Sequence, residues 1–148
     1  MKFSAKVRYA LAATIRMAQL YDVRDSVTLI SLSEELDISK IYLEQIFSLL
    51  KRGDVVSSIK GARGGYRLNR PPQNINALDV VASVDPSLFE ENDKSVPDNA
   101  FGIDAALQVL AYSKAKSALT SALSSISLEA LANEANHQNQ GKNFMYYL

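Results

Sequence analysis

A ten-residue stretch, Ile59-Lys60-Gly61-Ala62-Arg63-Gly64-Gly65-Tyr66-Arg67-Leu68, constrains this chain more than any other feature. It reads as a strand, a glycine-rich turn and a second strand. Glycine adopts positive φ at little cost, so three glycines between two strand-like runs indicate a tight hairpin. Cations at both ends and at the tip indicate a basic surface, and the glycines leave room for close approach to another molecule.

Two helices are predicted before the hairpin. Ser31 and Glu34 have the spacing of a capping box, which predicts the start of a short helix. After a tight turn, Ser39 predicts the start of a longer helix from Lys40 to Arg52, and Gly53 is expected to end it in left-handed geometry. A short helix, a turn, a longer helix and a basic hairpin are the parts of a winged helix-turn-helix. The expected fold is therefore mainly α with a small β wing.

The longer helix is the candidate recognition helix. A glutamine can pair with adenine in the major groove, and a glutamate can accept from the cytosine amino group. An ordinary amphipathic surface helix would show a similar pattern, but the capped helix before it and the basic hairpin after it favour DNA reading. The candidate contacts are Ser39, Lys40, Tyr42, Glu44 and Gln45.

The hairpin is the candidate wing. Arg63 lies at its tip, where it could enter a narrow minor groove, whose negative potential attracts arginine. Lys60 and Arg67 are expected to meet phosphates. A solvated basic hairpin without a partner is one alternative. A phosphate-binding loop of a nucleotide enzyme is disfavoured, because such loops open a helix rather than a second strand.

Charge is divided between the two halves of the chain. Residues 1–72 contain 12 Lys and Arg against 7 Asp and Glu, whereas residues 73–148 contain 4 against 9. The formal net charge of zero is therefore the sum of +5 on the first half and −5 on the second.

A first helix is expected from a Ser4 cap to about Tyr21. Its start is crowded with groups that could hold a phosphate, although a solvated helix start would look the same. These groups are Lys2, Ser4, Lys6 and Arg8.

Composition excludes several classes of function. The chain has no cysteine, which excludes disulfides, thiolate metal sites and thiol redox sensing. Its only histidine, His137, lies in a polar tail, so a multi-histidine metal site is excluded and acid–base catalysis has little to use. We find neither a membrane span nor a signal peptide, so we expect a cytoplasmic protein without metal, cofactor or enzymatic activity.

The second half of the chain predicts a dimerisation element. Beyond a helix over Ala77–Val84, expected to be capped by Asn76, and a loop over Asp85–Asn99, a long helical pattern runs from Ala100 to Ser125. Apolar and small side chains recur along it at three- and four-residue intervals and would pack closely against a two-fold partner. The expected interface residues are Ile103, Leu107, Leu110, Ala115, Ala118, Ala122 and Ile126.

Four parts are expected along the chain. Residues 1–84 form the DNA-binding domain and residues 85–99 a loop. Residues 100–133 hold the dimerisation helix and a short final helix capped by Ser127, and residues 134–148 form a C-terminal tail. The tail is polar at first and then turns apolar.

Three segments resemble the IscR/BadM-like family of winged-helix transcriptional regulators, which are usually dimeric bacterial proteins. The segments are MKFSAKVRYAL, SKIYLEQIFSLLK and KGARGGYRLNRPP, and the later ALTSALSSISLEAL is similar to the family's dimer helix and final helix. The resemblance covers about residues 1–131. It implies major-groove contacts from Ser39, Tyr42, Glu44 and Gln45, and wing contacts from Ser58, Lys60 and Arg63.

Many members of that family hold an iron–sulfur cluster through three cysteines in the loop that corresponds to residues 85–99, and this chain has none. The wing and tail are most similar to a cluster-free branch, the cysteine metabolism repressors called CymR. That resemblance implies a partner, the enzyme O-acetylserine (thiol)lyase, whose active site accepts a C-terminal aliphatic residue with its free carboxylate. Docking of the tail onto its own dimer is the alternative. The residues concerned are Phe144, Tyr146, Tyr147 and Leu148.

The sequence therefore predicts a dimeric repressor that binds a pseudo-palindromic DNA operator, with sulfur and cysteine metabolism genes as the targets that the resemblance implies. The alternative is a protein-interaction adaptor that binds a metabolic enzyme through its tail and has no specific DNA site. The net charge of +5 on residues 1–72 argues against the adaptor.

Overall fold

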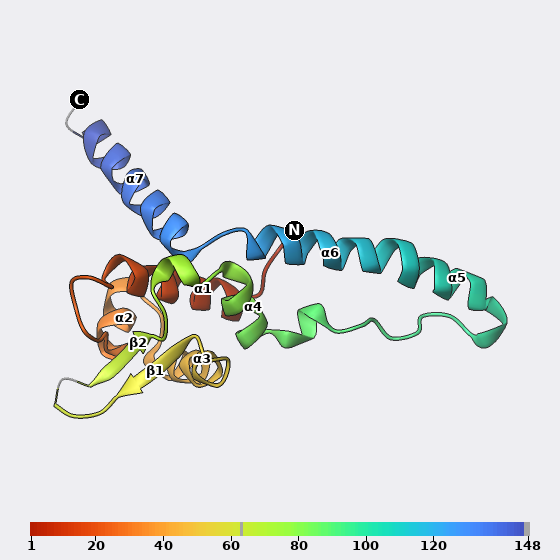
Figure 1. Cartoon of the computed structure of the whole chain (residues 1–148), viewed down its shortest axis with the longest axis horizontal. Helices are drawn as coiled ribbons and strands as arrows, with labels where there is room; N and C mark the ends of the chain where they lie inside the picture. The colour runs from red at the N-terminus through yellow and green to blue at the C-terminus, as the bar shows by residue number, and fades with distance from the viewer. Residues whose placement is uncertain (63, 147–148) are drawn as a thin grey trace.

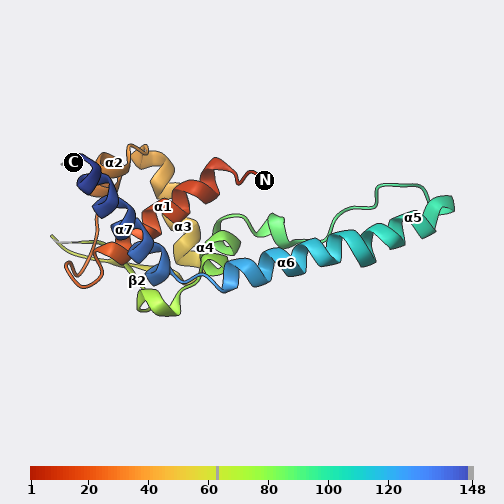
Figure 2. The ribbon, with the colours of Figure 1, turned by 90° about the horizontal axis from the view of Figure 1, so that it is seen from above.

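The computed structural model describes residues 1–62 and 64–146. Within them, four helices and a two-stranded hairpin form a body, from which a long helical rod and the last helix extend (Figure 1). The rod extends to one side of the body in both views, whereas the last helix runs toward the opposite side (Figure 2).

Helix α1 (Ala5–Gln19) crosses the body and packs against α4 and α7. The Ser4 hydroxyl accepts a hydrogen bond from the Val7 amide, which confirms the predicted cap. Val7 and Ala10 are fully buried. Thr14 is buried as well, and its hydroxyl donates to the Ala10 carbonyl at 2.9 Å, so this buried polar group is satisfied.

Helix α2 (Leu29–Leu36) begins earlier than predicted. The capping box expected from Ser31 and Glu34 is wrong, because Thr28 occupies the N-cap position and its hydroxyl accepts from the Ser31 amide at 3.1 Å. Thr28 thus satisfies one of the free amides of the first turn, and Ser31 becomes part of that turn.

Helix α3 (Lys40–Arg52) has the predicted bounds, and Ser39 caps it as expected. One face is fully buried and comprises Leu43, Ile46, Phe47 and Leu50. The left-handed residue expected at Gly53 is instead Asp54, with φ 62, whereas Gly53 has φ −80. Aspartate tolerates the left-handed region better than most residues, so the chain reverses one position later than predicted.

Strands β1 (Val56–Ile59) and β2 (Gly65–Leu68) form the predicted antiparallel hairpin. The Tyr66 ring packs on Phe47 of α3, with centroids 4.9 Å apart. On its other edge β2 pairs with Val27, because Tyr66 and Val27 exchange two backbone hydrogen bonds of 2.8 Å. The wing is therefore anchored to α3 through a side chain and to the loop before α2 through backbone.

Gly65 is the point of closest approach between the wing and that loop. A Cβ at this position would lie 2.5 Å from the Val27 carbonyl oxygen, and the backbone has φ +153. We expect Gly65→Ala to lower the free energy of unfolding by about 3 kcal/mol, measured by urea titration. Gly61→Ala is the control: φ is +112 but the space around it is open, so the loss should be about 1 kcal/mol. Equal losses would contradict the steric explanation.

Helix α4 (Ala77–Val84) follows a 3-10 turn, η1 (Pro72–Asn74). The predicted N-cap at Asn76 is confirmed. Asn76 and Asp79 form a complete capping box in which each side chain accepts from the other residue's amide at 2.9 Å.

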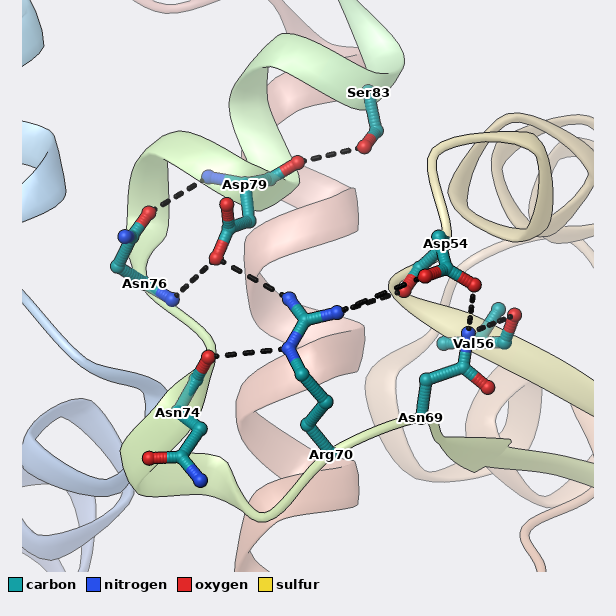
Figure 3. Close-up of polar contacts among 8 residues, drawn as sticks. All are labelled: Asp54, Val56, Asn69, Arg70, Asn74, Asn76, Asp79 and Ser83. Carbon is teal, nitrogen blue, oxygen red and sulfur yellow. Dashed lines mark hydrogen bonds and ion pairs between the residues drawn. The ribbon is translucent and has the colours of Figure 1, made fainter.

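Arg70 joins the base of the wing to α4 (Figure 3). Its Nη1 donates to the Asp54 carbonyl at 3.2 Å, its Nε donates to the Asn74 carbonyl at 3.3 Å, and its Nη2 lies 3.5 Å from the Asp79 carboxylate. One side chain thus connects the reversal after α3, the turn η1 and the first turn of α4. This network fixes the position of the wing relative to the body.

The long helix predicted over residues 100–125 is present in three consecutive stretches. These are α5 (Phe101–Ala106), the π-helical η4 (Leu107–Tyr112) and α6 (Ser113–Ser124). The loop before them contains the 3-10 turns η2 (Pro86–Phe89) and η3 (Asp98–Ala100). We call α5, η4 and α6 together the rod.

Helix α7 (Leu128–Tyr146) is much longer than predicted. Ser127 is confirmed as its cap, since its hydroxyl accepts from the Ala130 amide at 3.0 Å. The predicted end at Asn133 is wrong, because the polar segment that follows continues the helix. That segment has no proline, and its alanines, glutamines and asparagines allow a helix, so Gly141 alone does not stop it.

The hydrophobic core spans both halves of the chain. Leu123 of α6 and Leu128 of α7 belong to the same cluster as the buried faces of α1, α3 and α4. The backbone joins them too: the Ala77 amide donates to the Ile126 carbonyl, and the Leu128 amide donates to the Ile75 carbonyl, both at 2.8 Å. The base of the rod is therefore part of the body.

Candidate nucleic-acid interface

The first half of α3 presents a polar, exposed face. Lys40 and Glu44 form an ion pair of 3.6 Å, and both side chains remain about half exposed, at 53% and 54%. Gln45 is exposed and makes no hydrogen bond within the described part of the chain. Ser39, like Ser4 on α1, has its hydroxyl engaged as a helix cap. The face therefore offers an amide, a carboxylate and an ammonium, which suit base edges and phosphates.

Tyr42 connects α3 to α1. Its ring is half-buried and packs edge-on against Tyr9, with centroids 5.6 Å apart and planes at 89°. This contact places the first turn of α3 beside the first turns of α1, where the predicted basic cluster begins. Lys2 and Arg8 are exposed there, and Lys6 is half-buried. The Tyr9–Tyr42 contact thus brings together two predicted DNA-contacting clusters, one on α3 and one at the start of α1.

The wing contributes further cations. Lys60 and Arg67 are exposed, and neither forms an ion pair within residues 1–62 and 64–146. The exposed Ser58 hydroxyl accepts from Lys51 Nζ at 3.0 Å, which links β1 to the end of α3. Arg63, predicted for the tip, lies outside the described residues.

Ile41 is a candidate contact that sequence reasoning missed. It is 71% exposed at the second position of α3, between Lys40 and Tyr42. An exposed aliphatic side chain in this position can contact a thymine methyl group in the major groove. The signal was present in the sequence, because Ile41 lies off the face formed by Leu43 and Leu50, where a surface helix ordinarily has a polar residue.

The outer part of the rod exposes large apolar side chains. Of the predicted interface residues, Ile103 and Leu110 are 59% and 57% exposed, and Leu107 is half-buried. Phe101 and Val109, which were not predicted, are also strongly exposed. Apolar exposure of this kind on an extended element is typical of a protein–protein interface.

The smaller predicted interface residues divide into two groups. Ala115, Ala118 and Ala122 are exposed along α6. Ile126 is half-buried, packs against the core, and accepts a backbone hydrogen bond from Ala77. It therefore lies at the junction between the rod and the body rather than on the exposed stripe.

The residues predicted to bind a partner enzyme lie at the end of α7. The helix backbone includes Phe144 and Tyr146, but their side chains, and all of Tyr147 and Leu148, lie outside the described residues. Met145 is 76% exposed. The described helices include none long and apolar enough to cross a membrane.

The capped helix pair, the anchored basic hairpin and the exposed polar face of α3 define a winged helix-turn-helix protein that binds DNA. The chain belongs to the Rrf2 family, described as iron-dependent transcriptional regulators, and the match covers residues 3–134. The family resemblance found in the sequence is confirmed.

Relatives of known identity are regulators rather than enzymes, as the sequence predicts. The chain is 35% identical over 133 residues to the HTH-type transcriptional regulator IscR of Photorhabdus laumondii, a match covering 90% of this chain and 80% of the relative. It resembles the solved structure of T. potens IscR, with a TM-score of 0.72, 28% identity, and coverage of 99% and 97%. It also resembles CymR (YrzC), the global cysteine regulator of B. subtilis, with a TM-score of 0.70, 28% identity, and coverage of 90% and 98%.

The iron in the family's description can be tested against this chain's donor groups. The sequence contains no cysteine, and the described residues include no group of three His, Cys, Asp or Glu side chains able to hold a metal ion. Iron–sulfur clusters require thiolates, with histidine as an occasional replacement, and the loop over 85–99 offers only carboxylates. The residues present do not fit an iron–sulfur cluster.

Proposed function

We propose that the protein is a homodimeric, cluster-free repressor that binds a pseudo-palindromic operator through α3, the wing and the start of α1. The main support is the Tyr9–Tyr42 contact, which packs the first turn of α3 against α1, while Lys40 and Gln45 of α3 stay exposed. Two copies related by a two-fold axis would read half-sites about 34 Å apart, one turn of DNA or a multiple of it.

Selection of DNA from a random pool, followed by sequencing, tests this function. The expected result is an enriched motif with two-fold symmetry. The alternative is the adaptor that binds a metabolic enzyme without a specific DNA site. A pool that returned no enriched motif would favour that adaptor and contradict the repressor.

Lys60 provides a test of the wing. Lys60→Gln should weaken binding about equally on the selected operator and on a scrambled duplex, because phosphate contacts carry no sequence information. The slope of log affinity against log salt should fall by about 1 for each protomer, measured by fluorescence anisotropy. Lys94→Gln, in the loop before the rod, should leave the slope unchanged. A loss confined to the operator would contradict a phosphate role for Lys60.

The dimer is proposed to form along the rod. The exposed side chains of Ile103, Leu110 and Val109 would be covered by a second copy.

The target genes are proposed to be those of sulfur and cysteine metabolism. The support is the likeness to the B. subtilis global cysteine regulator, together with a donor set that does not fit the cluster chemistry of iron-sensing relatives. If the protein is a cytoplasmic repressor of these genes, deletion of its own gene should raise the transcripts of sulfur-assimilation genes. Lower transcripts would indicate an activator instead.

A further proposal concerns the end of α7, which we suggest binds O-acetylserine (thiol)lyase. Helix α7 projects from the body (Figure 1). Met145 near its end is exposed. A peptide ending in Tyr146-Tyr147-Leu148 should compete with substrate at the enzyme, and the same peptide with an amidated C-terminus should not. Equal competition by the acid and the amide would exclude capture of the terminal carboxylate.

A further inference from the structure

A cavity of about 280 Å³ lies between the C-terminal end of α1, the loop over residues 21–27 and strand β2. Polar groups make up most of its surface. Four buried apolar residues line its inner side, which we call the floor, and they are Met17, Leu20, Val27 and Leu68. None of the functions considered above uses this cavity.

Two arginines from different segments line the rim. Arg24 comes from the loop and Arg67 from β2, and neither forms an ion pair within residues 1–62 and 64–146. Asp25 is the one acidic group among the lining residues, so the charged groups of the rim sum to +1. Tyr21 and Tyr66 also line the cavity. An unpaired guanidinium presents a planar fork of donors that matches a carboxylate.

We propose that this cavity binds a small organic carboxylate. Arg24 and Arg67 would hold the carboxylate, and the rest of the ligand would lie against the floor. The volume falls just below the roughly 300–1,000 Å³ of typical small-molecule sites, which indicates a ligand smaller than a drug-sized molecule. Asp25 disfavours a phosphate dianion, because its carboxylate repels the second negative charge.

The position of the cavity would couple the ligand to the wing, an effect that rests on the proposed DNA-binding function. Loop and strand are already joined by the Val27–Tyr66 backbone hydrogen bonds of 2.8 Å. A carboxylate held by Arg24 and Arg67 would add a second link between the same two segments. It would also withdraw Arg67 from any DNA phosphate, so the ligand should weaken DNA binding.

Direct binding can be measured on the full chain without DNA by isothermal titration calorimetry, with 3-phenylpropionate as the probe. We expect a dissociation constant of about 1 mM or lower. The neutral analogue 3-phenylpropanamide and inorganic phosphate should each bind at least about ten times more weakly. Absence of binding at about 10 mM probe would overturn the proposal, and so would equal binding of the acid and the amide.

Variants locate the site. Arg24→Gln/Arg67→Gln should weaken probe binding at least about tenfold, whereas Arg67→Lys, which keeps the charge but loses the fork, should have an intermediate effect. Arg52→Gln, an exposed arginine outside the cavity, should bind the probe normally. Circular dichroism melting confirms that each variant is folded. Normal probe binding by the double variant would overturn the assignment of these two residues.

The effect on DNA is tested separately. Saturating probe should reduce affinity for the selected operator at least about threefold in the unmodified protein and have no effect on Arg24→Gln, which retains Arg67 for DNA. Unchanged operator affinity would overturn the coupling but not the cavity. Failure to bind any specific DNA would instead count against the proposed function, because probe binding is measured without DNA.

Discussion

An Ile103→Asp/Leu110→Asp variant is expected to be monomeric and to lose at least about 100-fold of its affinity for a palindromic operator. Both side chains are more than half exposed on the rod and would be desolvated in the proposed dimer. Carboxylates at these positions would have to be buried in the interface without partners. A two-fold interface doubles this cost, because both copies carry the same substitutions. A monomer engages a single half-site and loses the gain from linking two binding events.

The oligomeric state is measured by sedimentation velocity and the affinity by anisotropy on whole operators and single half-sites. Half-site affinity should be nearly unchanged, because the residues proposed to touch DNA lie on α1, α3 and the wing. Ala130→Asp/Asn139→Asp adds the same two charges at exposed positions of α7 and should remain dimeric. A dimeric Ile103→Asp/Leu110→Asp variant would refute the rod as the interface.

Gln45→Ala should abolish base preference at one position of each half-site and reduce operator affinity by about 100-fold. The amide of Gln45 is exposed and makes no hydrogen bond within the described residues, so it is free to bond to a base edge. A bidentate contact of this kind is worth about 1–3 kcal/mol of discrimination, and a dimer loses it twice.

Repeating the DNA selection with the variant measures the preference directly. The enriched motif should keep its symmetry but show equal base frequencies at the position that Gln45 reads. Ser48→Ala, an exposed change on the same helix one turn further on, should return the original motif. An unchanged motif from Gln45→Ala would exclude this side chain from base reading.

Much of the fold could be predicted because its helix starts are encoded locally. Ser4, Ser39, Asn76 and Ser127 each precede a clear helical pattern, and each caps a helix as expected. The hairpin could be predicted equally well, since its glycines, cations and flanking apolar residues all lie within one short stretch. Such signals involve neighbours in sequence and require no knowledge of the rest of the molecule.

The errors arose where two local signals competed or where no signal was present. Thr28 and Ser31 are both good caps three residues apart, and the choice of Thr28 accompanies the pairing of Val27 with a strand nearly forty residues away in sequence. No glycine or proline follows Asn133 before Gly141, so the composition of this segment could not distinguish a polar helix from a tail.

The site was only partly accessible from sequence. The face of α3 follows from helical periodicity, but the edge-on contact of Tyr9 with Tyr42 joins residues that sequence cannot bring together. The cavity beside the wing is assembled from three segments, and its unpaired arginines are ordinary surface cations when read along the chain. Only the folded structure shows which side chains far apart in the sequence lie close together.

The shared core bears on how such a protein can change over evolutionary time. Leu128 is fully buried, and the segment around Ser127 pairs with the backbone on either side of Asn76. A fragment ending after α4 would expose that core and free the amide of Ala77. The DNA-reading half is therefore not a module that recombination could graft onto a foreign sensor. New control must instead arise by substitution within the existing chain, at its surfaces, its cavity or its last helix.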